Sequence, residues 1–186
     1  MNREQEKITP IRFGVLDVET RRSSREVGGW HRAKEMGVSV AVLYDSGTDS
    51  FSSFTQERVP ELAERLRDLD LVVGFNILSF DYAVLGPHAS VVWKDFPTLD
   101  MLASIRKHLR YPVSLDKLAQ STLGARKSAD GLQALTWWKE GEMDKIEEYC
   151  RQDVAVTRDL YLYGREHGHL LFTNKARQLV RVPVTW

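Results

Sequence analysis

The chain has 186 residues, 42% of them hydrophobic, and its 26 Lys and Arg balance its 26 Asp and Glu. This length suits one domain with a sizeable core, and a single cysteine, Cys150, excludes an internal disulfide or a cysteine-based zinc cage. A net charge of zero argues against holding nucleic acid by bulk electrostatics alone.

The amino terminus shows no signal peptide, and no apolar run approaches the ~18 residues of a membrane span. We therefore expect a cytoplasmic protein that does not enter a membrane.

The first third of the chain has the pattern of β-strands. Strands are expected over Arg12–Thr20, Gly37–Asp45 and Phe51–Thr55. The SGTDS turn between the last two predicts that they pair antiparallel. The connection Arg21–Met36 has no clear period, and connections of that length inside a compact domain are often functional.

After Pro60 the pattern becomes helical, and the uniformly apolar run Leu71–Phe75 is typical of a strand buried on both faces. The remaining expected elements are a helix over Phe80–Leu85, a strand over Thr98–Leu102, mostly helices to about residue 168, and a closing hairpin within Leu170–Val184. This order predicts an α/β fold with helices packed on a mixed sheet. We expect a single domain over residues 1–186, with a core of about 11–168 and an extension over 169–186.

Asp17 and Glu19 are two acids within an otherwise apolar strand. Alternate residues of a strand share a face, so the two carboxylates lie side by side, about 7 Å apart. Burying two like charges is costly, and a divalent metal would compensate both. An Arg or Lys neighbour, or solvation of Glu19 at the strand end, would also relieve them. D-x-E alone is weak evidence, since chance predicts about 0.9 occurrences.

A second acidic motif, Asn76-Ile-Leu-Ser-Phe80-Asp81, directly follows the buried strand. Ends of strands in open α/β sheets are where ligand groups lie. Asp81 or Ser79 could instead simply cap the next helix. The pattern N-x3-F-D has a chance expectation of only about 0.01, so it is the more specific signal.

A third acid lies in an amphipathic stretch over Ile146–Tyr163, where Tyr149 and Asp153 are one turn apart. We expect both on the core-facing side, together with Ile146, Val156 and Leu160, and Cys150 off that face as a small buried hydrophobe. The simplest alternative is an ordinary buried Tyr–Asp hydrogen bond. Acids where the pattern demands apolar residues are typical of functional sites.

D-x-E, N-x3-F-D and Y-x3-D in this order resemble the three motifs of the DEDD, or DnaQ-like, exonuclease superfamily, and the tyrosine resembles its DEDDy branch. The stretch Ser114–Lys127 is similar to family-B polymerase exonucleases and to YprB-like ribonuclease H-like proteins. The resemblance covers roughly Phe13–Tyr163. It implies a ribonuclease H-like fold, a five-stranded mixed sheet whose second strand is antiparallel.

The activity that this resemblance implies is 3′–5′ exonuclease cleavage of DNA or RNA by a two-metal-ion mechanism. Asp17, Glu19, Asp81 and Asp153 would bind two divalent ions, Mg²⁺ or Mn²⁺, since all-oxygen ligation suits both. Tyr149 would orient or help activate the attacking water. The expected partner is nucleic acid with a single-stranded 3′ end, and a protein partner in a repair or processing complex is a further expectation.

Thr20 and Asn76 match substrate-side positions of the family. Phe80 is a further substrate-side candidate that could pack against a base, although core packing is the more usual role for an aromatic beside a helix start. Trp30 and His31 in the long connection could stack bases. Positive charge concentrates in two segments, Met101–Lys127 with six Lys and Arg against one acid, and Arg165–Trp186 with four against one. Either could follow a phosphate backbone or be a solvated face.

Three alternatives to the exonuclease stay open. An endonuclease could use the same acids. A catalytically silent nucleic-acid-binding module could share the fold, although the presence of all four acids and the tyrosine speaks against it. A trimming subunit of a polymerase, helicase or defence complex is the third.

Overall fold

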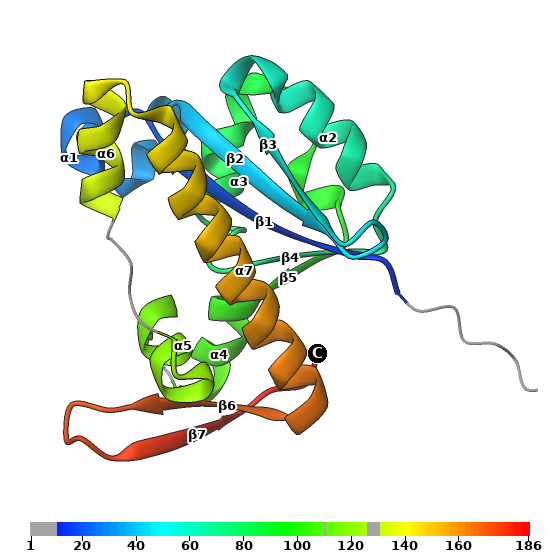
Figure 1. Ribbon diagram of the computed structural model, residues 1–186, viewed down its shortest axis with the longest axis vertical. Helices are drawn as coiled ribbons and strands as arrows, with labels where there is room; N and C mark the ends of the chain where they lie inside the picture. Colours follow the sequence, from blue (N-terminus) through cyan, green and yellow to red (C-terminus); the bar gives the residue numbers. More distant parts are fainter. Residues whose placement is uncertain (1–10, 110, 126–130) are drawn as a thin grey trace, which may run out of the picture.

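A computed structural model describes residues 11–109, 111–125 and 131–186 (Figure 1). Its main sheet has five strands in the order β3-β2-β1-β4-β5. In chain order these are β1 (Phe13–Thr20), β2 (Val38–Asp45), β3 (Ser50–Phe54), β4 (Leu71–Gly74) and β5 (Thr98–Asp100).

The predicted mixed sheet with an antiparallel second strand is confirmed. β2 pairs antiparallel with both β1 and β3, while β1, β4 and β5 are parallel. The last strand is shorter than predicted, because Asp100 ends it by accepting a hydrogen bond from the backbone N–H of Ala103 at 3.0 Å. That contact caps the helix that begins at Met101.

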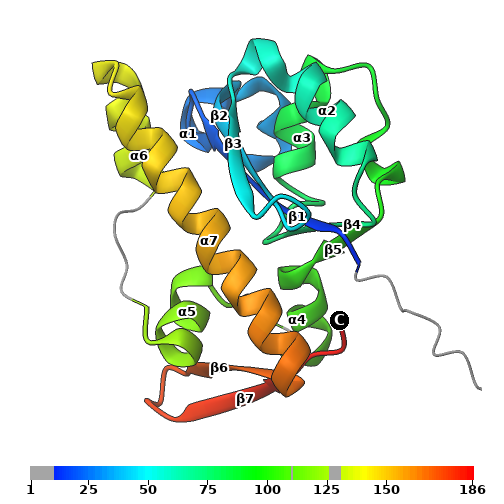
Figure 2. The same ribbon diagram turned by 45° about the vertical axis from the view of Figure 1, so that its right-hand side comes forward.

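Helices cover both faces of the sheet (Figures 1 and 2). The α-helices that follow β3 are α2 (Val59–Arg67), α3 (Asp81–Leu85), α4 (Met101–Leu109), α5 (Leu115–Leu123), α6 (Gly131–Glu140) and α7 (Met143–His167). Alternation along β1 divides the core: Leu16 and Val18 pack in the cluster with α2 and α3, whereas Val15 packs in the cluster with α4, α5 and α7. Asp17 and Glu19 therefore belong to the face that α7 covers.

The buried stripe of α7 differs from the prediction. Cys150, Val154 and Thr157 lie at its centre, whereas Tyr149 and Asp153 lie at its edge and are only partly buried. Ile146 and Leu160 are buried as predicted, and Tyr149 and Val156 pack against the edge of the same core. Cys150 is buried as predicted, but it faces the sheet directly.

The connection Arg21–Met36 is structured, although its sequence has no long period. A short helix α1 (Ser24–Val27) begins with a capping box in which Ser23 and Glu26 bond each other's backbone N–H. A 3₁₀ helix, η1, follows over Trp30–Glu35. Val27, Ala33 and Met36 are buried beside α3, so the connection packs against the fold.

The chain ends in an antiparallel hairpin of β6 (His169–Thr173) and β7 (Leu179–Pro183). Leu170, Phe172 and Val182 bury their side chains in the α7 side of the core. The hairpin lies beside α4 and α5 at the far end of α7 from α6 (Figures 1 and 2). None of the helices in the described part of the chain is long and apolar enough to cross a membrane.

Candidate active site

Three carboxylates from distant parts of the chain meet at the carboxyl end of β1. Asp17 and Glu19 extend from the same face of β1, and Asp153 comes from α7, which crosses that face. One oxygen of each lies within 4.8 Å of the other two. That spacing allows one cation to contact all three.

Asp81 lies beside this group and outside the set of three. It is the first residue of α3 and only 2% exposed. Burial, followed by the charge of Asp17, raises the pKa of Asp81 well above its usual range, while hydrogen bonds from the backbone N–H groups of Asp81 itself and Val18 lower it. β1 and β4 are parallel, so the end of β1 and the loop after β4 meet at one edge of the sheet.

The acids raise one another's pKa. Burial raises the pKa of Asp17 to about 6. Burial and then the charges of Asp17, Asp153 and Asp81 hold the pKa of Glu19 well above its ordinary value. Within the described residues, no Lys or Arg forms an ion pair with Asp17, Glu19 or Asp81. The oxygen-only, electron-rich set therefore fits a divalent cation such as Mg²⁺ or Mn²⁺.

The side chain of Cys150 contacts Asp17 directly, a contact that the sequence did not predict. Its buried thiol lies 3.4 Å from the backbone oxygen of Asp17 and 3.5 Å from its Oδ2. Burial and the neighbouring acids raise the pKa of Cys150, so the thiol stays protonated and donates to Asp17. The available signal was its position one turn from both Ile146 and Val154 on α7.

Asp100 holds the loop that carries the second motif. Besides capping α4, its carboxylate accepts the backbone N–H groups of Asn76 and Leu78, each at 3.1 Å. Asn76 has a left-handed backbone with a φ of 69°, a conformation that Asn tolerates better than most residues. The Asn76 carbonyl in turn accepts from the N–H groups of Ser79 and Phe80. These bonds fix the turn that delivers Asp81 to β1.

The acids open into a cavity of about 840 Å³. Asp17, Glu19 and Asp153 line it together with the expected substrate-side residues Thr20, Asn76 and Phe80. The Thr20 hydroxyl donates to the backbone oxygen of Arg22 at 3.0 Å, which leaves its oxygen as an acceptor.

Trp30 forms an exposed aromatic edge on the same cavity. Its side chain is 70% exposed, and its ring meets that of Phe80 edge-on with centroids 5.7 Å apart. Phe80 also packs against the core cluster around α3, as the core-packing alternative predicted. The long connection thus contributes an aromatic surface beside the acids.

Tyr149 lies at the edge of the acidic group. Burial, the charges of Asp153 and Glu19, and a hydrogen bond to Asp153 raise the pKa of its phenol. The ring of Trp137 packs edge-on against it with centroids 6.3 Å apart. The phenol therefore keeps its proton at neutral pH and donates a hydrogen bond rather than acting as a base.

The mixed sheet with an acidic cluster at its carboxyl edge defines an α/β protein of the ribonuclease H-like class. Residues 15–163 match the RNase_H superfamily, so the chain belongs to that superfamily. No curated protein is significantly similar to the sequence.

Among solved structures, the family B DNA polymerase of the hyperthermophilic archaeon Pyrobaculum calidifontis is similar in fold, with a TM-score of 0.63 and 16% identity. The match covers 84% of this chain and 25% of the polymerase chain, so this chain spans about a quarter of that protein. At this identity the likeness concerns the fold alone.

Proposed function

We propose that this chain is a metal-dependent 3′–5′ exonuclease of the DEDDy, DnaQ-like type, which hydrolyses phosphodiester bonds of DNA or RNA by a two-metal-ion mechanism. Membership of the RNase_H superfamily supports a nuclease. The observation that carries the proposal is the meeting of Asp17, Glu19 and Asp153 within 4.8 Å, with buried Asp81 beside them.

The four carboxylates would hold the two ions. Asp17, Glu19 and Asp153 form the closer group, and Asp17 also lies beside Asp81, so Asp17 suits the role of a shared ligand. Bound divalent ions supply a more acidic water and stabilise negative charge on a phosphate. The phenol of Tyr149, whose raised pKa keeps it protonated, would hold the attacking water by a hydrogen bond.

The terminal nucleotide would occupy the 840 Å³ cavity. Phe80 and the exposed ring of Trp30 offer a surface on which a base can stack. Asn76 and the Thr20 oxygen offer polar contacts for the terminal sugar. A stacked, unpaired base favours a single-stranded end.

The test is cleavage of single-stranded DNA and RNA, labelled separately at the 5′ and 3′ ends, with Mg²⁺, Mn²⁺ or EDTA. We expect a metal-dependent ladder that shortens the 5′-labelled strand and immediate release of the 3′ label. Asp17→Asn should lose at least about 100-fold in rate because it removes a shared ligand. Asp144→Asn, at an exposed acid in the first turn of α7, is the matched control.

Internal cuts that vanish in Asp17→Asn would replace the exonuclease with an endonuclease. Absence of cleavage with every metal would refute the enzymatic proposal. Equal losses of cleavage rate in Asp17→Asn and Asp144→Asn would show that the activity does not depend on the carboxylate cluster.

A further inference from the structure

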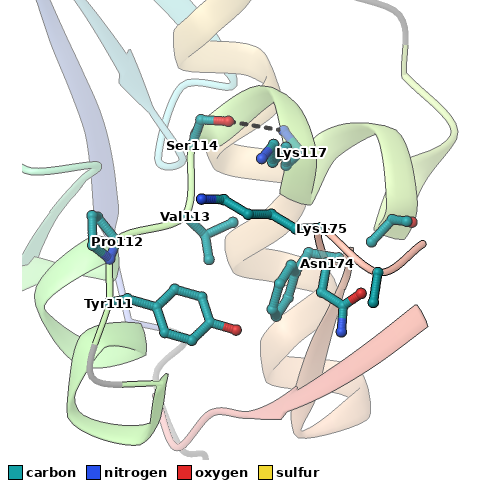
Figure 3. A pocket seen from close by; sticks show the side chains of 10 residues that line it. Tyr111, Pro112, Val113, Ser114, Lys117, Asn174 and Lys175 are labelled. Carbon is teal, nitrogen blue, oxygen red and sulfur yellow. Dashed lines mark hydrogen bonds between the residues drawn. The ribbon is translucent and has the colours of Figure 1, made fainter. Parts of the chain in front are cut away.

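A second cavity, of about 680 Å³, lies next to the acidic one. Its walls are the segment Tyr111–Ser114, the first turns of α5 with Lys117, and the tip of the closing hairpin over Phe172–Ala176 (Figure 3). The hairpin wall lies outside the residues that match the superfamily, which end at 163. The cavity is thus partly built by an element beyond the family match.

This cavity is positively charged within a chain of zero net charge. Lys117 reaches into it from α5 and Lys175 from the hairpin, and both side chains are exposed (Figure 3). The ten described residues that line it include no Asp or Glu. Two ammonium groups brought to one cavity repel each other, and a bound anion would relieve that repulsion.

An aromatic side chain accompanies the lysines. Tyr111 is 47% exposed, and its ring packs edge-on against buried Phe172 with centroids 6.3 Å apart. Phe172 therefore holds the Tyr111 ring while a face of that ring stays open to the cavity. Lysines beside an open aromatic ring are the combination that binds single-stranded nucleic acid.

The two cavities are adjacent. Pro112, Val113 and Ser114 line both of them. A strand that leaves the acidic cavity over these residues would reach the basic one next. The strand β6 that leads to the hairpin tip is fixed to α5, because the Thr122 hydroxyl exchanges hydrogen bonds of 2.9 Å with both backbone groups of Leu171.

We propose that the basic cavity binds the nucleotides upstream of the 3′ end of a single-stranded nucleic acid, with Lys117 and Lys175 on phosphates and Tyr111 stacked on a base. The direction of the strand rests on the proposed exonuclease function. The cavity would make affinity depend on strand length, because a dinucleotide fills only the acidic cavity whereas a longer strand fills both.

The test is binding by the full chain in EDTA, where the proposed activity is silent. Fluorescein-labelled single-stranded DNA and RNA 12-mers are titrated by anisotropy, and unlabelled dinucleotides compete. Lys117→Ala with Lys175→Ala should weaken 12-mer binding about tenfold and lower the salt slope by about 1.4, as expected for two lost phosphate contacts. Tyr111→Ala should also cost about tenfold. Dinucleotide binding should stay unchanged.

Lys94→Ala, at an exposed lysine outside both cavities, is the matched control. The proposal is overturned if the wild type does not bind either 12-mer, if Lys94→Ala loses as much, or if dinucleotide and 12-mer weaken equally. If the wild type prefers the DNA or the RNA 12-mer and the double lysine variant does not, the preferred 12-mer shows which nucleic acid the basic cavity binds. Lysine-dependent binding by a protein that cleaves nothing would refute the exonuclease and leave the strand-binding cavity in place.

Discussion

At the scale of single residues, the surroundings of the Tyr149 hydroxyl limit the role that it can take. Its raised pKa keeps it protonated at neutral pH, so it can donate a hydrogen bond and cannot accept a proton from water. We expect Tyr149→Phe to fold normally and to lower kcat about 10- to 100-fold with little change in KM, because only the hydrogen bond is lost. Single-turnover cleavage at pH 6 to 9 measures this.

Tyr163→Phe, at a tyrosine on the same helix that packs against His167, provides the control for Tyr149→Phe. The loss in the Tyr149 variant should be equal across the pH range. If the cleavage rate of the wild type changes with pH on the alkaline side and that of Tyr149→Phe does not, the phenol ionises during the reaction and this prediction is wrong.

The sequence predicts the positions of some residues of the candidate site and not of others. The period of a strand places Asp17 beside Glu19 without any knowledge of the fold. The contacts of Cys150 with Asp17, and of Asp100 with the Asn76 loop, join residues 133 and 24 positions apart. Such contacts depend on how elements pack, and no local period encodes them.

At the scale of elements, strands were easier to predict than helix faces. All five strands of the sheet were predicted. The run Leu71–Phe75 was the clearest, because burial on both faces leaves few polar interruptions. The face of α7 was predicted in part: Ile146 and Leu160 are buried, whereas Cys150, Val154 and Thr157 rather than Tyr149 and Asp153 lie between them. Tyr149 and Val156 complete a helical stripe as well as Cys150 and Thr157 do, so the period alone does not choose between them. The capping box of Ser23 and Glu26 was a readable signal within the long connection.

The closing hairpin is an element whose removal should affect the whole fold. Ending the chain at Gly168 removes buried Leu170, Phe172 and Val182 and exposes the apolar faces of α5 and α7 that they cover. Burying each such side chain is worth about 1.5–3 kcal/mol, so we expect a loss of at least about 4 kcal/mol in the free energy of unfolding. Urea unfolding followed by circular dichroism, with dye binding to exposed apolar surface, measures it.

Lys175→Ala is the control for that truncation, because it alters the exposed tip of the hairpin and leaves the core intact. Its unfolding midpoint should stay within the error of the wild type. A truncated chain as stable as the full one would show that residues 11–168 form a complete folding unit and that the hairpin is an accessory.

At the scale of the whole molecule, the protein has no net charge, but its positive and negative side chains lie in different places. Acids collect in one cavity and lysines in the cavity beside it, with Pro112–Ser114 between them. The fold tolerates the acids by raising their pKa, which makes the stability of the whole molecule depend on pH. The same crowding of carboxylates that would bind cations therefore weakens the metal-free protein.

This coupling predicts a particular pH dependence. The pKa of Asp17 is about 6 in the folded protein and 3.8 in its unperturbed state. Between pH 3.8 and about pH 6 the Asp17 carboxyl is therefore protonated in the folded protein and ionised in the unfolded chain. The free energy of unfolding of the metal-free protein should therefore fall as pH rises from about 4 to above 6, on the order of 3 kcal/mol for Asp17. Asp45, whose pKa Arg12 lowers, acts in the opposite direction, so the comparison must be with a variant.

Asp17→Asn is that variant, because it keeps the shape and removes the charge. In EDTA at pH 8 it should be more stable than the wild type, and at pH 4 the two should converge. Added Mg²⁺ or Mn²⁺ should stabilise the wild type at pH 8, by about 2.7 kcal/mol at 100 times the Kd, and the variant far less. Urea unfolding of both proteins at pH 4 and pH 8, in EDTA or with added metal, measures these differences in the free energy of unfolding. A wild type that is the more stable protein in EDTA at pH 8 would mean that Asp17 is already compensated by a group of the chain itself and that the cluster does not need a cation.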